Sequence, residues 1–353
     1  MPGLLRDDLS DMQVAVCPAP LPRNQPVFNE NGVSNDQQDV IPQPRPARNL
    51  QGLLRFAMET TRAEDAAGPS NFDAMEEERR KFLEDAFKSM TIDVIEIFIK
   101  QIKVFDDVGS VTATSSVDQY TEAFYTISEH ICSIDMANDF YKIGGFTIFD
   151  SCLKSPNSKI KLGACDLLAE LCQNNPFCQM IVIENDFLPL VLEILDKDED
   201  DDVCIKALYA LSCIVRSNMD GCTKFLELQG LEVLLKTMRK NNDKLRIKSA
   251  FFLQALCVMR RDIVEKIMNL CFIPVLINIL NGEHSPTHEH IMSLIKVMIE
   301  NSQEATNICK NPANGLESIL KGIHEYSKDK EEYYEEFEYC QDLLNRLFPN
   351  SNN

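Results

Sequence analysis

Five stretches of the sequence share one apolar pattern: GGFTIFDSCL (144–153), NDFLPLVLEIL (185–195), QGLEVLLKTM (229–238), CFIPVLINIL (271–280) and NGLESILKGI (314–323). Their common anchor position recurs after 42, 43, 42 and 43 residues, at Phe146, Leu188, Leu231, Ile273 and Leu316. The residues three and seven positions after each anchor are apolar in every stretch. Apolar side chains at this spacing lie on one face of a helix. The pattern therefore predicts one helix repeated five times.

A second helix repeats in step with the first. The matching segments are GACDLLAEL (163–171), KALYALSCI (206–214) and SAFFLQALC (249–257), in which Leu168, Leu211 and Leu253 correspond. A period near 42 residues with two or three helices per unit is typical of armadillo and HEAT arrays. Each unit has an apolar face that only a stacked neighbour covers. We therefore expect an all-α, armadillo/HEAT-like right-handed superhelical repeat solenoid with a binding groove.

The chain outside the repeats has a different composition. Eight of the sixteen prolines lie in the first 48 residues, a composition that buries too little apolar surface to repay the entropy of ordering. The glycines at 144, 145, 230 and 315 recur at one place in the repeat and predict a turn there. The expected domains are a disordered Pro-rich arm (1–48), a short amphipathic helix (49–68), N-terminal capping helices (73–140), armadillo-like repeats with a C-terminal capping helix (141–348) and a tail (349–353).

Composition limits the classes of partner. The chain has 35 Lys and Arg against 55 Asp and Glu, a net charge of −20, which argues against nucleic acid or an anionic membrane as the main partner. No apolar run approaches the roughly 18 residues of a membrane span, and no secretory signal is visible at the start. We therefore expect a cytoplasmic or also nuclear location, where the thirteen cysteines are reduced, buried thiols.

Motifs of catalysis and of cofactor binding are missing from the sequence. It contains no phosphate-cradling glycine loop, no nucleophile elbow and no H-E-x-x-H, so we expect neither an enzyme nor a bound cofactor. One histidine cluster, HSPTHEH (284–290), places His284 and His288 four residues apart, a spacing that suits a metal ion. The alternative is that Ser285 and Pro286 start a helix with the histidines in its exposed first turn. Because no second cluster completes a ligand set, we expect no metal.

Charge is distributed in blocks. Residues 196–202 and 325–338 each carry a net charge of −5, whereas 236–248 carries +5. The basic block either meets an acidic surface on a protein partner or offsets nearby acidic residues, and the charge pattern alone leaves both interpretations open.

Solenoids bind partners in the groove lined by the last helix of each repeat. Helical spacing places Asp166, Gln173, Ser212 and Ser293 on that lining. The predicted partner-binding residues on the concave face and in the basic block are Glu170, Asn174, Tyr209, Arg216, Lys244, Arg246, Lys248, Phe251, Gln254, His288 and Lys296. For Tyr209 and Phe251 the alternative is packing within the core.

Several strings resemble a known family. KALYALSCIVR (206–216), CQNNPFCQ (172–179), KLRIKSAFFLQALCV (244–258), HSPTHEH (284–290) and NLQGLLRFAMETT (49–61) are similar to the Hsp70-binding-protein family, which comprises armadillo-type nucleotide exchange factors of the 70-kDa heat-shock chaperones. The resemblance implies a monomer that forms a 1:1 complex with the ATPase domain of such a chaperone. It also implies that the concave face clasps this domain, opens its nucleotide cleft and promotes ADP release. A different class of function stays open, an armadillo scaffold or adaptor without exchange activity.

Overall fold

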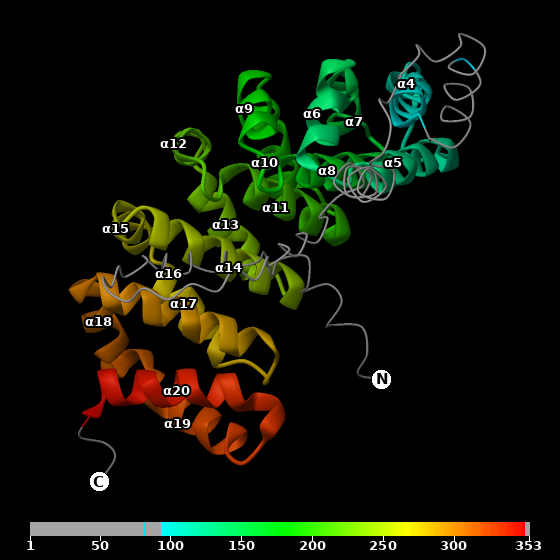
Figure 1. The fold of residues 1–353 in the computed structure, drawn as a ribbon. Coiled ribbons are helices and arrows are strands. Elements are labelled where there is room, and N and C mark those ends of the chain that lie inside the picture. Colours follow the sequence, from blue (N-terminus) through cyan, green and yellow to red (C-terminus); the bar gives the residue numbers. More distant parts are fainter. Residues whose placement is uncertain (1–80, 82–92, 350–353) are drawn as a thin grey trace, which may run out of the picture. The chain divides into compact units, whose positions relative to one another are not determined.

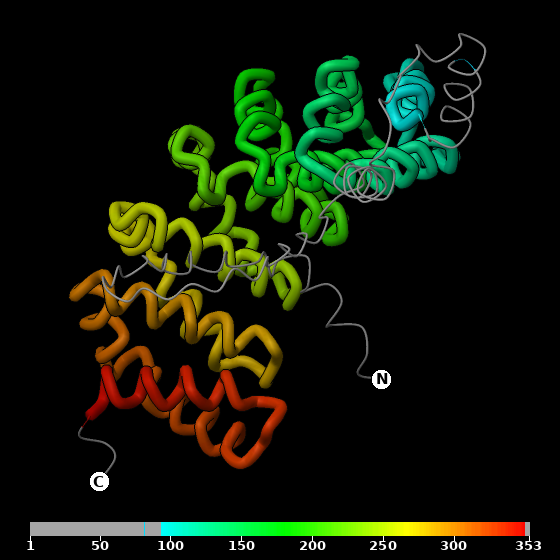
Figure 2. Tube along the Cα trace, in the orientation of Figure 1, coloured from blue at the N-terminus to red at the C-terminus, as the bar shows by residue number. Residues whose placement is uncertain are grey.

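The computed structural model describes residue 81 and residues 93–349, all within one compact unit, Glu77–Asn353. The expected arm, the amphipathic helix at 49–68 and most of the tail lie outside the described residues. Within them the chain is helical and has no strand. Figures 1 and 2 show the helices following one another as repeated units. This arrangement confirms the all-α repeat solenoid.

Each repeat has three helices. The first helices are α6 (Ile134–Lys142), α9 (Pro176–Glu184), α12 (Met219–Glu227), α15 (Asp262–Asn269) and α18 (Gln303–Lys310). The second helices are α7 (Ile148–Leu153), α10 (Phe187–Lys197), α13 (Gly230–Arg239), α16 (Phe272–Leu280) and α19 (Leu316–Ser327). The third helices are α8 (Ser158–Cys172), α11 (Asp201–Val215), α14 (Asp243–Met259), α17 (Thr287–Asn301) and α20 (Tyr334–Leu347). Two further helices, α4 (Val94–Val104) and α5 (Asp118–His130), precede the first repeat.

Four short 3₁₀ turns complete the described elements, at Val108–Ser110, Gly145–Thr147, Pro312–Asn314 and Glu331–Tyr333. The boundary expected at residue 141 falls inside α6, because α6 is the first helix of the first repeat. The third helices pack against one another in chain order, α8, α11, α14, α17 and α20, as Figure 1 shows. Helix α5 packs against α8 and extends this row at its N-terminal end. This continuous row positions the candidate site.

The repeat core has the register that the sequence predicts. All five anchors, from Phe146 to Leu316, are buried, and Leu168, Leu211 and Leu253 are fully buried. Since α14 contacts both α11 and α17, its apolar side chains help to join three repeats. The apolar pattern therefore identifies the surfaces along which the repeats stack.

Turns between first and second helices use left-handed backbone. Gly144 and Gly315 have φ values of 89° and 66°, as expected for glycine turns. Gly230 serves a different purpose, because Gln229 takes the left-handed position with φ 59°. A Cβ on Gly230 would lie 2.2 Å from the ring of Phe225. Glycine at 230 is therefore required for close packing of α12 on α13, and not for the turn.

The cysteines behave as small apolar side chains. The twelve within the described residues are all free, and ten of them are buried. Burial raises the pKa of Cys152 and Cys257 to about 12, which keeps both as unreactive thiols. This confirms the expected buried thiols for the described part of the chain.

Among the described helices, none is by itself long and apolar enough to cross a membrane. The pair α15 and α16 meets the length and composition limits only when taken together, and the two helices are bent by 75° at their junction.

Candidate partner-binding surface

Polar and aromatic contacts join neighbouring third helices along their row. Between α8 and α11, Asp166 pairs with Lys206 at 2.8 Å. Between α14 and α17, the Gln254 amide donates to the Ser293 hydroxyl at 3.2 Å. We call the row of such side chains the third-helix surface, and its defining residues are Tyr125, Asp166, Glu170, Lys206, Phe251, Gln254, Lys296 and Asp342. Contacts of this surface join α8 to α11, α14 to α17 and α17 to α20.

The C-terminal part of this surface combines stacking with an ion pair. The rings of Phe251 and His290 lie 4.5 Å apart, which joins α14 to α17. Lys296 on α17 pairs with Asp342 on α20 at 2.9 Å, and its ammonium lies 5.8 Å from the centre of the Tyr339 ring. Contacts of this kind hold side chains in place before a partner arrives.

A hollow of 520 Å³ lies between α5 and α8, at the N-terminal end of the third-helix surface. Gly163, in its lining, lets the two helices approach each other closely: a Cβ there would lie 2.4 Å from the Phe124 ring. Its lining includes the exposed ring of Tyr125 and the charged side chains of Glu129, Lys159, Asp166 and Glu170. The lining has three carboxylates and one ammonium group, and one of the carboxylates, Asp166, is paired with Lys206, so the hollow is weakly acidic.

Tyr125 is not among the binding residues predicted from the sequence, although its side chain is large and 59% exposed. Tyrosine is enriched among residues that dominate binding energy at protein interfaces. The Tyr125 hydroxyl donates to Glu129 at 2.6 Å, which holds the ring over the hollow. Residues 118–130 lack the repeat pattern, so the sequence offered no register in which to place this side chain.

Several predicted binding residues are partly exposed on or beside this surface. Glu170 lines the hollow, and Phe251, Gln254 and Lys296 lie on α14 and α17. The other partly or fully exposed members of the predicted set are Asn174, Arg216, Lys244 and Arg246. Asn174 is not on the helix lining but in the turn after α8, where its φ is 53°. Arg216 follows the last residue of α11.

Three predicted binding residues are buried instead. Lys248 on α14 lies with its ammonium 5.4 Å from the centre of the Tyr209 ring on α11, a cation–π contact that joins two repeats. His288 is only 2% exposed. Its pKa is lowered to about 4, mainly by burial, so its ring is neutral. A partner reaches little of these three side chains, and we leave them out of the proposed contact surface.

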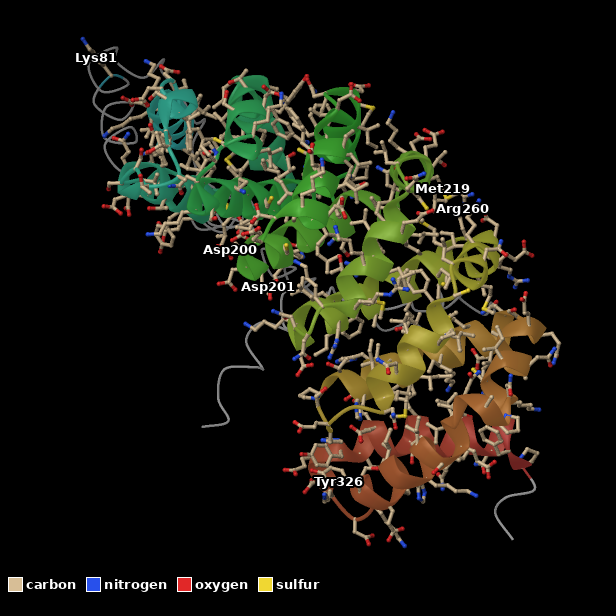
Figure 3. All side chains as sticks on the ribbon, turned by 180° about the vertical axis from the view of Figure 1, so that it is seen from behind. Lys81, Asp200, Asp201, Met219, Arg260 and Tyr326 are labelled. Carbon is tan, nitrogen blue, oxygen red and sulfur yellow. The ribbon has the colours of Figure 1, made fainter. Side chains whose placement is uncertain are left out.

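Two cations of the basic block between residues 236 and 248 pair with carboxylates of the acidic block. Lys236 pairs with Asp196 at 2.7 Å and Lys240 with Asp201 at 3.4 Å, so two of its cations face the acidic block. Figure 3 labels Asp201 and its neighbour Asp200 at the start of α11. Arg246 turns back and donates to the Met238 carbonyl at 3.4 Å, near the end of α13. The geometry favours the interpretation that this block offsets local acids.

One residue of the histidine cluster contacts a carboxylate from the C-terminal helix. His284, in the loop before α17, has its Nε2 atom 3.0 Å from Glu336 in the first turn of α20. The rings of Tyr326 and Tyr333 stack on His284 at 4.3 Å and 4.8 Å, and Figure 3 labels Tyr326 at this end of the chain. Glu336 is buried and lies 52 residues from His284 in the sequence.

Two family models match the chain. The SIL1/FES1/HPBP1 C-terminal domain matches residues 136–271, and the nucleotide exchange factor Fes1 model matches residues 50–140. Together the matches cover the expected cap and the first three repeats.

Curated relatives match over most of the chain. Hsp70-binding protein 1 of Homo sapiens is 31% identical over 313 residues, which is 86% of each chain. The Mus musculus protein of the same name is 30% identical over 86% of this chain and 87% of its own. The Hsp70 nucleotide exchange factor fes1 of Schizosaccharomyces pombe is 27% identical over 40% of this chain and 50% of its own.

Solved structures support the fold alone. An engineered protein superposes with a TM-score of 0.59 at 15% identity, over 73% of this chain and all of its own. A designed armadillo repeat protein superposes with a TM-score of 0.56 at 15% identity, over 70% and 98%. The three-helix repeat is therefore an armadillo repeat.

Proposed function

The chain belongs to the SIL1/FES1/HPBP1 family, and from this membership we propose that it is a nucleotide exchange factor of an Hsp70 chaperone. The identity of 31% to Hsp70-binding protein 1 of Homo sapiens, over 86% of each chain, is the observation that carries the proposal. Relatives named as Hsp70 nucleotide exchange factors also occur in fungi. On this proposal the protein is not an enzyme itself, and the chaperone's ATPase domain is its partner.

The mechanism is differential affinity. A protein that binds the open form of the ATPase domain more tightly than the ADP-closed form shifts the domain toward the open form. By linkage, ADP binding and factor binding then weaken each other by the same factor. No catalytic group is needed for this effect. A monomeric factor in a 1:1 complex is sufficient, and the free thiols suit the reducing cytosol.

The third-helix surface is the proposed contact. Its N-terminal hollow has an exposed aromatic ring beside three carboxylates, a combination that accepts the aliphatic stem and charged head of a lysine or arginine. We therefore expect the partner to place a basic side chain over Tyr125 and near Glu170. This contact differs from the basic-block contact that the charge pattern suggested.

Release of a fluorescent ADP analogue from a purified Hsp70 ATPase domain tests the function. The full chain should accelerate release in proportion to the amount of complex formed. Binding without faster release would reject exchange activity and favour the adaptor. Analytical ultracentrifugation of the mixture checks the 1:1 stoichiometry, and microscopy of a tagged chain checks the cytoplasmic location.

Two pairs of variants test the surface. Tyr125→Ala should slow nucleotide release, whereas Met219→Ala should not, because Met219 is similarly exposed but lies on the first helix α12. Glu170→Lys should slow association at low salt, whereas Glu265→Lys on α15 makes the same charge change outside the surface. If both surface variants exchange nucleotide like the wild type, the hollow is not part of the contact.

A further inference from the structure

Three ligand groups from separate elements meet at the C-terminal end of the solenoid. His284 comes from the loop after α16, His288 from the first turn of α17 and Glu336 from the first turn of α20. Their ligand atoms all lie within 4.8 Å of one another. No other group of three such residues meets this limit in the described part of the chain. The juxtaposition supplies the third ligand that the histidine cluster lacks in the sequence.

His288 has a buried ring with poor hydrogen bonding. It is 2% exposed, and neither Nδ1 nor Nε2 makes a hydrogen bond within normal distance and angle limits. A weaker hydrogen bond with the backbone of Ile279 raises the pKa of the ring, against the larger lowering by burial. Leaving a buried polar group without a good partner is unfavourable, and nearly all such groups in proteins are paired. A metal ion is one partner that would satisfy a neutral imidazole nitrogen at this position.

The surroundings already orient the other two ligands. Nε2 of His284 lies 3.0 Å from both carboxylate oxygens of Glu336, so the two groups point at the same place. The rings of Tyr326 and Tyr333 also contact the His284 ring, the second of them edge-on. Zinc sites owe much of their affinity to such outer groups, which hold the ligands in position.

We propose that His284, His288 and Glu336 form a zinc site that fastens the C-terminal helices α19 and α20 to the preceding repeat. Two imidazole nitrogens and one carboxylate are a ligand set that zinc uses. At Zn–N distances of about 2.0 to 2.1 Å, tetrahedral ligand atoms lie about 3.4 Å apart, so small side-chain movements close the site. A fourth position is left for water, whereas most structural zinc sites have four protein ligands. The site acts on the stability of the C-terminal repeat, since its ligands lie on or beside α17 and on α20.

Zinc binding to the metal-free full chain tests the proposal. Isothermal titration should show one zinc per chain, and zinc should raise the unfolding temperature. Cobalt in place of zinc should give the absorption of a tetrahedral site with nitrogen and oxygen ligands. Hydrogen exchange in α20 should slow when zinc is bound, because the metal joins α20 to α17.

Variants separate this site from other zinc ligands. His284→Asn and Glu336→Gln should each weaken zinc binding by at least about 10- to 100-fold, the loss that outer ligand partners alone produce. His324→Asn is the matched control, since His324 also stacks on an aromatic ring, Phe337 at 4.6 Å, but lies outside the triad. Circular dichroism of the metal-free variants checks that each remains folded.

Two results would overturn the proposal. The first is a metal-free wild type that binds no zinc, or binds it without a change in unfolding temperature. The second is zinc binding that survives His284→Asn and Glu336→Gln but is lost when the exposed thiols of Cys132 and Cys271 are alkylated. That pattern, together with strong sulfur-to-cobalt absorption, would assign the metal to surface thiols.

Discussion

Replacing Leu253 with alanine should open the third repeat locally. Leu253 is fully buried on α14, the helix that contacts both α11 and α17. The substitution removes about three methylene equivalents at about 0.8 kcal/mol each, or about 2.4 kcal/mol. The cavity left behind adds to this, so we expect a total loss of about 3 to 4 kcal/mol. Val258→Ala on the same helix is the control, because Val258 is 75% exposed and should change stability by less than about 0.5 kcal/mol.

Hydrogen exchange measures where this loss appears. Repeats couple mainly to their nearest neighbours, so the weakening should concentrate in α11, α14 and α17. A loss of 3 kcal/mol corresponds to exchange about 150-fold faster for amides that exchange through this opening. Exchange that is unchanged in α14, or equally faster in every repeat, would contradict the stacking register or the local coupling. Urea unfolding followed by circular dichroism gives the total change independently.

Three further predictions concern packing and thiols. Lys248→Glu should destabilise the fold by about 3 kcal/mol because it buries an unpaired carboxylate, whereas the exposed Arg239→Glu should stay within about 0.5 kcal/mol, both by urea unfolding. Gly230→Ala should lose about 1 to 3 kcal/mol, because its Cβ overlaps the Phe225 ring, and an unchanged unfolding midpoint would mean that this ring moves aside freely. In a Cys17→Ser variant, a thiol reagent at pH 8 should modify the two exposed cysteines quickly and the ten buried ones only after unfolding, since burial keeps their pKa well above 8.

The fold could be predicted because its information is local and repeated. An apolar residue at each anchor indicates a buried helix face. One such stretch alone would be an ambiguous signal, but five copies at a constant spacing predict the repeat. The roles of the turn glycines could be predicted only in part from the repeat pattern. Gly144 and Gly315 adopt left-handed backbone, but Gly230 is a packing residue, and a glycine letter is the same in both roles.

The site could be predicted only in part, because charge patterns do not say where a side chain turns. Neighbouring positions on a helix point about 100° apart. The basic block spans the end of α13, the turn after it and the start of α14, so its cations are distributed over several surfaces. Arg246 turns to the end of α13, and Lys248 packs on Tyr209, although both belong to the same block. Contacts between residues far apart in the sequence could not be predicted either. His284 and Glu336, for example, are 52 residues apart.

Rigidity of the third-helix surface connects the packing with the proposed exchange activity. A factor that acts by differential affinity must not adapt equally well to both forms of its partner, because equal binding shifts nothing. The contacts Asp166–Lys206, Gln254–Ser293 and Lys296–Asp342 each cross from one repeat to the next, so they restrain the repeats relative to one another. A surface held in this way loses affinity when its partner has the wrong shape. We therefore expect the stacking of the repeats to contribute to this discrimination, in addition to the residues that touch the partner.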